Sequence, residues 1–174
     1  VLTTLGLGYI PEISSTTTAA LTNMGGATVV EMKPCTVTTV PCPAANVVNT
    51  IRSFTQNGTT GFTAGYNFTG VTGTNRWGAG TVNFLEGSYF DFSAGDLVLS
   101  VNDGASYYKI DVVDVNNRKV TIKVTVDGKI AITGAILDAA GVPSFDKTQI
   151  KSLVLVVDDA AVTTGDLVLT TLGL

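Results

Sequence analysis

Apolar and polar residues alternate along much of this chain, which is the pattern of β-strands that bury one face. The alternation is clearest at residues 120–126, where every second residue is Val or Ile. Apolar strands are also predicted before it, at 106–115, and after it, at 130–137. The turn residues Asn116-Asn117 and Asp127-Gly128 separate the three segments. The sequence therefore predicts a three-stranded antiparallel meander.

Similar patterns predict strands elsewhere, in segments rich in β-branched residues. These segments are residues 27–32, 36–40, 62–69, 80–85, 88–92, 96–101, 149–158 and 166–172. Leu153–Val157 is apolar without alternation, which indicates a central strand covered on both faces. At residues 45–55, Val47, Val48, Ile51 and Phe54 have helical spacing, so a short helix is predicted there, and a single turn at 138–141. Many short strands separated by turn signals predict an all-β single domain, a jelly roll or β-sandwich, with at most one or two short helices.

Composition narrows the classes of function. Charged residues are 14% of the chain and hydrophobic residues 45%, which excludes a disordered chain. So few charges also suggest that neighbouring subunits cover part of the apolar surface. The net charge of −4, without a basic cluster, argues against a nucleic-acid partner. No apolar run approaches the roughly 20 residues of a membrane span.

The chain contains no histidine, which removes Ser-His-Asp and Cys-His catalysis. The carboxylate pair Asp111 and Asp114 is three residues apart, so on a strand the two side chains point to opposite faces. Asp158-Asp159 follows an apolar strand and is typical of a turn. We therefore predict that the chain is not an enzyme and has no cofactor. Calcium held by Asp103, Asp158 or Asp159 with loop carbonyls remains a possible exception.

Two further features bear on localisation. The sequence begins at Val1 rather than Met, from which we expect a removed signal peptide and an extracellular protein. Cys35 and Cys42 bracket six residues, so they can form a disulfide in an oxidising compartment; two buried free thiols are the alternative. The sequons at Asn57 and Asn67 are candidate glycosylation sites, although chance matches are common in a chain rich in Asn and Thr.

One heptapeptide, Val-Leu-Thr-Thr-Leu-Gly-Leu, occurs at both ends of the chain. The first copy is Val1, Leu2, Thr3, Thr4, Leu5, Gly6 and Leu7. The second copy is Val168, Leu169, Thr170, Thr171, Leu172, Gly173 and Leu174. An apolar strand exposed on a monomer promotes aggregation, whereas inserted into a neighbouring subunit it would join the two copies. The first copy is therefore a candidate donor strand and the second its partner or acceptor strand. The alternative is that both copies pair within one subunit.

With these features, the chain resembles the subunits of archaeal bundling pili. The fold of those subunits is similar to that of the TasA/camelysin group of secreted biofilm-fibre proteins. The resemblance rests on the apolar strand 1–7, the Thr/Val-rich β body, and the strand entries Gly95-Asp96 and Gly165-Asp166. It implies a donor strand at residues 1–10 and a jelly-roll domain at 11–174. It also implies identical subunits as partners in a filament, and neighbouring filaments bundled for cell–cell adhesion in a biofilm.

Two other functions remain open. Tyr89, Phe90 and Phe92, with Trp77, could form a carbohydrate platform, or they could pack in the core. In the first case the chain would be a monomeric extracellular carbohydrate-binding or adhesin module. A viral capsid or tail protein with a jelly roll is the other option.

Overall fold

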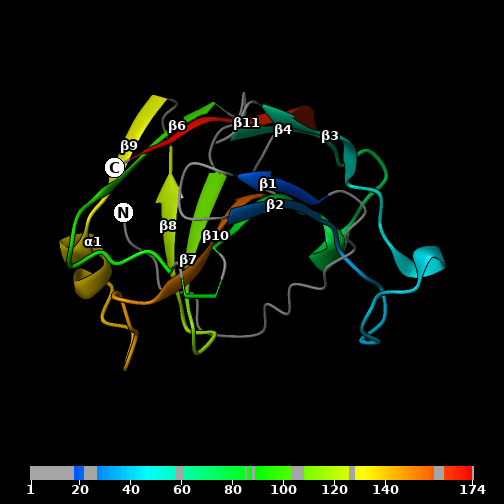
Figure 1. Ribbon diagram of the computed structural model, residues 1–174. Coiled ribbons are helices and arrows are strands. Elements are labelled where there is room, and N and C mark those ends of the chain that lie inside the picture. The colour runs from blue at the N-terminus through cyan, green and yellow to red at the C-terminus, as the bar shows by residue number, and fades with distance from the viewer. Residues whose placement is uncertain are drawn as a thin grey trace.

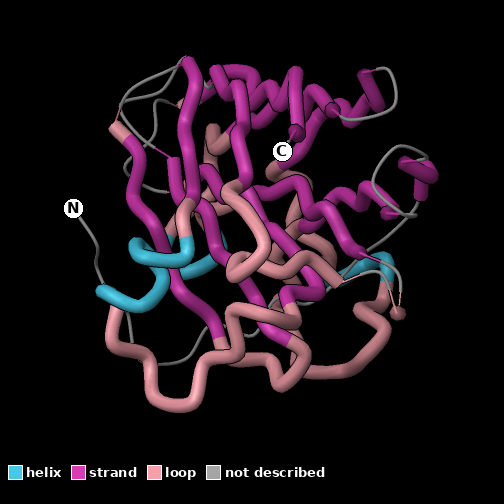
Figure 2. The backbone as a smooth tube through the Cα atoms, turned by 60° about the vertical axis from the view of Figure 1, so that its left-hand side comes forward, coloured by secondary structure: helices cyan, strands magenta, loops and turns pink. Residues whose placement is uncertain are grey.

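The structure is a computed structural model of the 174-residue chain. It describes residues 18–21, 27–57, 61–84, 86–87, 89–102, 108–125, 128–158 and 163–173. Two antiparallel sheets pack face to face as a β-sandwich (Figure 1). Figure 2 shows that long loops gather at one end of the two layers of strands.

Sheet 1 has six strands in the order β1-β2-β5-β10-β7-β8. They are β1 (Thr18–Leu21), β2 (Ala27–Met32), β5 (Gly78–Phe84), β10 (Ile150–Val157), β7 (Tyr108–Asp114) and β8 (Lys119–Val124). Sheet 2 has five strands in the order β3-β4-β11-β6-β9. They are β3 (Ile51–Asn57), β4 (Gly61–Asn67), β11 (Thr164–Gly173), β6 (Leu97–Asn102) and β9 (Gly128–Ile132). The helices are α1 (Gly134–Ala139) and the 3₁₀ turns η1 (Ala44–Asn46) and η2 (Gly73–Asn75).

The strand order is that of a jelly roll. When β4 to β11 are counted from one to eight, sheet 2 has the order 1-8-3-6 and sheet 1 the order 2-7-4-5. Strand β3 extends one sheet, and β2 and β1 extend the other. The predicted all-β sandwich with few short helices is therefore confirmed, whereas the predicted donor strand lies outside the described residues.

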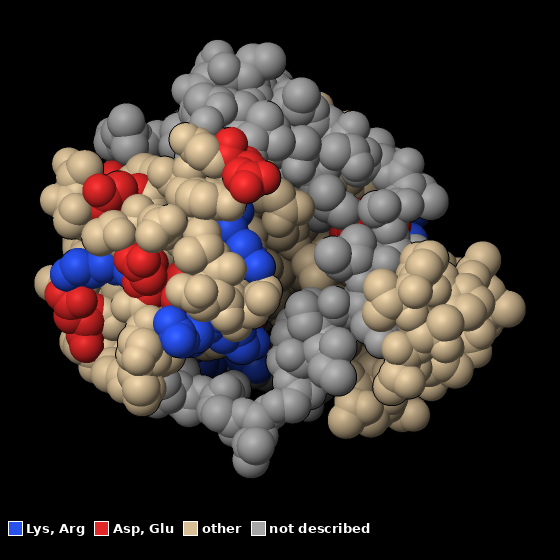
Figure 3. Space-filling view, turned by 60° about the horizontal axis from the view of Figure 1, so that its bottom comes forward, with Lys and Arg blue, Asp and Glu red and all other residues tan. Residues whose placement is uncertain are grey.

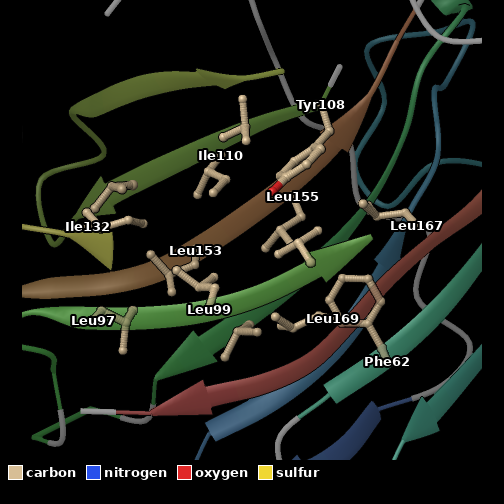
Figure 4. Close-up of a cluster of buried hydrophobic side chains, with 14 of the residues drawn as sticks. Phe62, Leu97, Leu99, Tyr108, Ile110, Ile132, Leu153, Leu155, Leu167 and Leu169 are labelled. Atoms are coloured by element: carbon tan, nitrogen blue, oxygen red, sulfur yellow. The ribbon is translucent and has the colours of Figure 1, made fainter. Parts of the chain in front are cut away.

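The core lies between the sheets, and β10 is buried on both faces, as its sequence predicts. Leu153 and Leu155 of β10 meet Leu99 and Leu169 of sheet 2 in this core (Figure 4). Val154 points to the outer face of sheet 1, where it joins a second buried cluster. A continuous apolar run is needed here because both faces of the strand lose their contact with water.

The predicted meander at 106–137 is wrong in its last strand. Strands β7 and β8 form the expected hairpin, but β9 pairs with β6 in the opposite sheet. An apolar–polar alternation shows that one face of β9 is buried, but not which sheet contains the strand. Residues 135–137 lie in α1, where the Thr133 hydroxyl accepts a hydrogen bond from Ile136 N at 3.2 Å and caps the helix. The helical turn predicted at 138–141 thus begins earlier than expected.

The helix predicted at 45–55 is also wrong. Ile51 and Phe54 belong to β3, whose pairing with β4 shifts register between Ile51 and Ser53. A β-bulge of this kind lets residues three apart share one face, which produces the spacing of a helix. The predicted strands at 36–40 and 88–92 are absent from the described structure, which has only isolated bridges at Cys35 and Phe90 there.

Candidate functional site

The second copy of the heptapeptide forms most of β11, an interior strand of sheet 2. Strand β11 lies between β4 and β6, with Val168 opposite Thr63 of β4 and Leu169 opposite Phe62. Leu169 is fully buried in the core. The first two residues of this heptapeptide copy therefore lie between two neighbouring strands.

Beyond Leu169, β11 keeps only one of its two neighbours. Its pairing with β4 ends at Leu169, whereas its pairing with β6 shifts register and continues from Thr171 to Gly173. Among the described strands, none pairs with the other side of residues 171–173. Figure 1 shows β11, in red, running on beside β6 toward the C-terminal label. The backbone of this segment forms an open sheet edge within the described structure.

The first copy cannot be placed. Residues 1–7 lie outside the described part of the chain, as does Leu174. The predicted roles of Val1–Leu7 as donor strand and of Val168–Leu174 as acceptor strand therefore stay predictions.

The predicted disulfide is confirmed. Cys35 and Cys42 are joined, with their Cα atoms 6.0 Å apart, and no described cysteine is free. The closed loop projects from the sandwich beside η1, in cyan in Figure 1. Its Val40 side chain is 78% exposed. A disulfide on such an exposed loop is typical of proteins from oxidising compartments.

Replacing both cysteines with Ser is expected to lower the free energy of unfolding by about 2.5 kcal/mol, because the bond closes a short loop in the unfolded chain. Urea denaturation followed by circular dichroism measures this loss. The loop lies outside the sandwich core, so the far-UV spectrum should not change. A double variant as stable as the native chain would contradict the expectation.

The two sequons lie at the ends of strands in sheet 2. Asn57 is the last residue of β3, and Asn67 is the last residue of β4. The Asn67 side-chain oxygen accepts a hydrogen bond from Thr69 N at 2.9 Å, and Thr69 is exposed. Glycosylation of either asparagine stays a prediction.

The described carboxylates of the candidate pairs have structural partners. Asp111 accepts hydrogen bonds from Lys119 at 2.8 Å and from Thr121 at 2.6 Å. Asp158 is paired with Lys109. The described residues contain no group of three or more potential metal ligands, while Asp103 and Asp159 lie outside them. These contacts give the Asp111 and Asp158 carboxylates structural partners on sheet 1.

Hydrogen bonds from Ser93 lower the pKa of the solvent-accessible Asp91 carboxyl group. The Ser93 hydroxyl donates to it at 2.6 Å and Ser93 N at 2.7 Å, and these bonds hold the pKa of Asp91 below its ordinary value of 3.8. Because the pKa is lower in the folded state, the stabilisation is present above pH 3.8 and is lost as the pH falls through the lowered pKa. Replacing Ser93 with Ala should raise the pKa of Asp91 toward 3.8 in an NMR titration. An unchanged titration would contradict this assignment.

The aromatic residues divide between the core and the surface. Phe90 and Phe92 pack against each other in the core, with ring centroids 4.6 Å apart. Trp77 is buried in the cluster on the outer face of sheet 1. Core packing is therefore confirmed for these three residues, whereas Tyr89 is half-buried outside both clusters.

Comparisons with known proteins leave the family open. No protein-family model and no curated protein matches this chain. A solved structure described as that of PfGH50B is similar with a TM-score of 0.47 and 10% identity. The similarity covers 69% of this chain and 20% of that chain, so this chain spans about a fifth of that protein's length. A similarity of this size assigns neither family nor activity.

In the described ranges, no helix has the length and apolar character that a membrane crossing requires.

Proposed function

We propose that this chain is a structural subunit of an extracellular filament, in which residues 1–7 of one copy pair with sheet 2 of the next copy. The observation that carries the proposal is the place of the second heptapeptide copy inside sheet 2. Residues 1–7 have the identical sequence, so Val1 and Leu2 are as compatible with a place between two strands as Val168 and Leu169 are. This supports strand exchange, in which main-chain hydrogen bonds supply affinity and alternate side chains supply specificity.

The open side of residues 171–173 is the proposed receiving edge. A donated strand there would continue the line of β4 and complete the pairing of β11. The donor and the receiving edge are different surfaces of one chain, so each contact leaves a free donor and a free edge. Contacts of this heterologous kind do not close, and they build filaments. Lateral contacts between such filaments, which the resemblance to bundling pili implies, would then join cells in a biofilm.

A competing peptide tests this proposal on the full chain. A synthetic peptide of residues 1–10 should occupy receiving edges and shorten the polymers as its concentration rises, measured by light scattering. The matched control is the same peptide with Leu2 and Leu5 replaced by Asp, which should have no effect. Equal effects of the two peptides, or none from either, would contradict the proposal.

A further inference from the structure

The outer face of sheet 1 contains a hollow of about 410 Å³, here called the outer hollow. Its floor comes from strands that are adjacent in the sheet but distant in sequence. Asn83 of β5, Ser152 of β10 and Val113 of β7 are neighbours in register, and Val154 lies in the next row. Figure 3 looks toward the outer side of sheet 1 and shows Lys and Arg side chains gathered on part of that surface.

The wall of the outer hollow is polar and includes the aromatic ring of Tyr89. Tyr89 and Glu86 come from the segment after β5. Lys151 lies where the pairing of β10 with β7 shifts register, and its amino group donates a hydrogen bond to the Asn117 side chain across the hollow's rim. This bond joins two of the wall residues.

Several polar groups in the outer hollow are available to a ligand. Within the described part of the chain, no hydrogen bond engages the side chain of Asn83, Glu86 or Tyr89. An apolar ligand would bury these groups without partners, at a cost in free energy. Among the described residues that line the site, Lys151 and Glu86 carry opposite charges, so this part of the lining does not favour an anion. A ligand that combines apolar faces with hydrogen-bonding groups therefore fits this site.

We propose that the outer hollow binds a neutral saccharide. The ring of a sugar has an apolar C–H face, which can stack on Tyr89 and lie over Val154 and Met32. Its hydroxyl groups can donate hydrogen bonds to the Glu86 carboxylate, and they can both donate to and accept from the Asn83 amide. The volume is within the range of ligand-binding pockets, roughly 300–1,000 Å³. This site is independent of the proposed strand exchange, which uses sheet 2.

The single tryptophan provides the measurement. Trp77 packs in one cluster with Met32 and Val154, which line the outer hollow. We expect the fluorescence of the full chain to change saturably with at least one of cellobiose, maltose, lactose and diacetylchitobiose. Tyr89→Ala and Asn83→Ala should each weaken that binding roughly tenfold, equivalent to about 1.4 kcal/mol. Tyr89→Phe should retain most of it, and Lys129→Ala, on β9 of sheet 2, should bind as the native chain does.

Circular dichroism confirms that each variant is folded before titration. The proposal is overturned if none of the four disaccharides changes the fluorescence at millimolar concentration. It is also overturned if Tyr89→Ala and Asn83→Ala bind as tightly as Lys129→Ala. The proposal is also overturned if the fluorescence depends on protein concentration but not on saccharide concentration. That result would indicate that the outer hollow is a contact between copies of the chain.

Discussion

Replacing Leu2 with Asp is expected to leave the domain folded and abolish polymerisation, whereas the same replacement at Leu169 should unfold the domain. The two leucines occupy the same position in the two heptapeptide copies. Leu169 is fully buried in the core, so Leu169→Asp removes its apolar burial and places a carboxyl group there. This change should cost at least about 4 kcal/mol. Under strand exchange, the partner of Leu2 belongs to another copy, and Leu2→Asp affects assembly alone.

Urea denaturation and sedimentation velocity separate the two effects. Leu2→Met, which keeps the apolar volume, is the matched control and should polymerise as the native chain does. Equal destabilisation by Leu2→Asp and Leu169→Asp would show that both copies pair within one subunit. Polymers that persist in Leu2→Asp would exclude residues 1–7 as the joining strand.

Replacing Asp114 with Ala is expected to lower the free energy of unfolding by about 3–5 kcal/mol. The Asp114 carboxylate is fully buried and accepts hydrogen bonds from three backbone N–H groups. They are Asn116 N at 2.9 Å, Arg118 N at 2.8 Å and Asp146 N at 2.9 Å. It thereby ties the β7–β8 turn to the loop before β10, and its removal leaves three donors without partners.

The measurement is urea denaturation of Asp114→Ala beside a matched control. Asp138→Ala removes a carboxylate that is 61% exposed and whose partner among the described residues is Lys147, so its loss should be below about 0.5 kcal/mol. Asp114→Asn keeps one acceptor oxygen and should fall between the two. Similar losses in all three variants would refute the structural role of Asp114.

Local sequence patterns predicted most strands because alternation and β-branched content directly reflect a half-buried strand. The predictions were wrong where two different local structures produce the same pattern of apolar and polar residues. The bulge in β3 places Ile51 and Phe54 on one face with helix-like spacing. The Asp127-Gly128 pair marks a change of direction, but it carries no information on whether β9 stays beside β8 or crosses to sheet 2.

The two candidate sites differ in how far the sequence revealed them. The heptapeptide is visible as an exact repeat, so its first and second copies were found without a structure. The outer hollow has no such signal. Asn83, Val113 and Ser152 are far apart in sequence, and only the order β5-β10-β7 makes them neighbours. Of the predicted aromatic platform, only Tyr89 lines this site.

Negative-stain electron microscopy of the full chain beside a variant without residues 1–8 tests the filament proposal most directly. We predict filaments from the full chain and single particles from the deletion variant, whose circular dichroism should remain that of a β-sandwich. Uniform single particles in both samples, or filaments in both, would contradict the proposal.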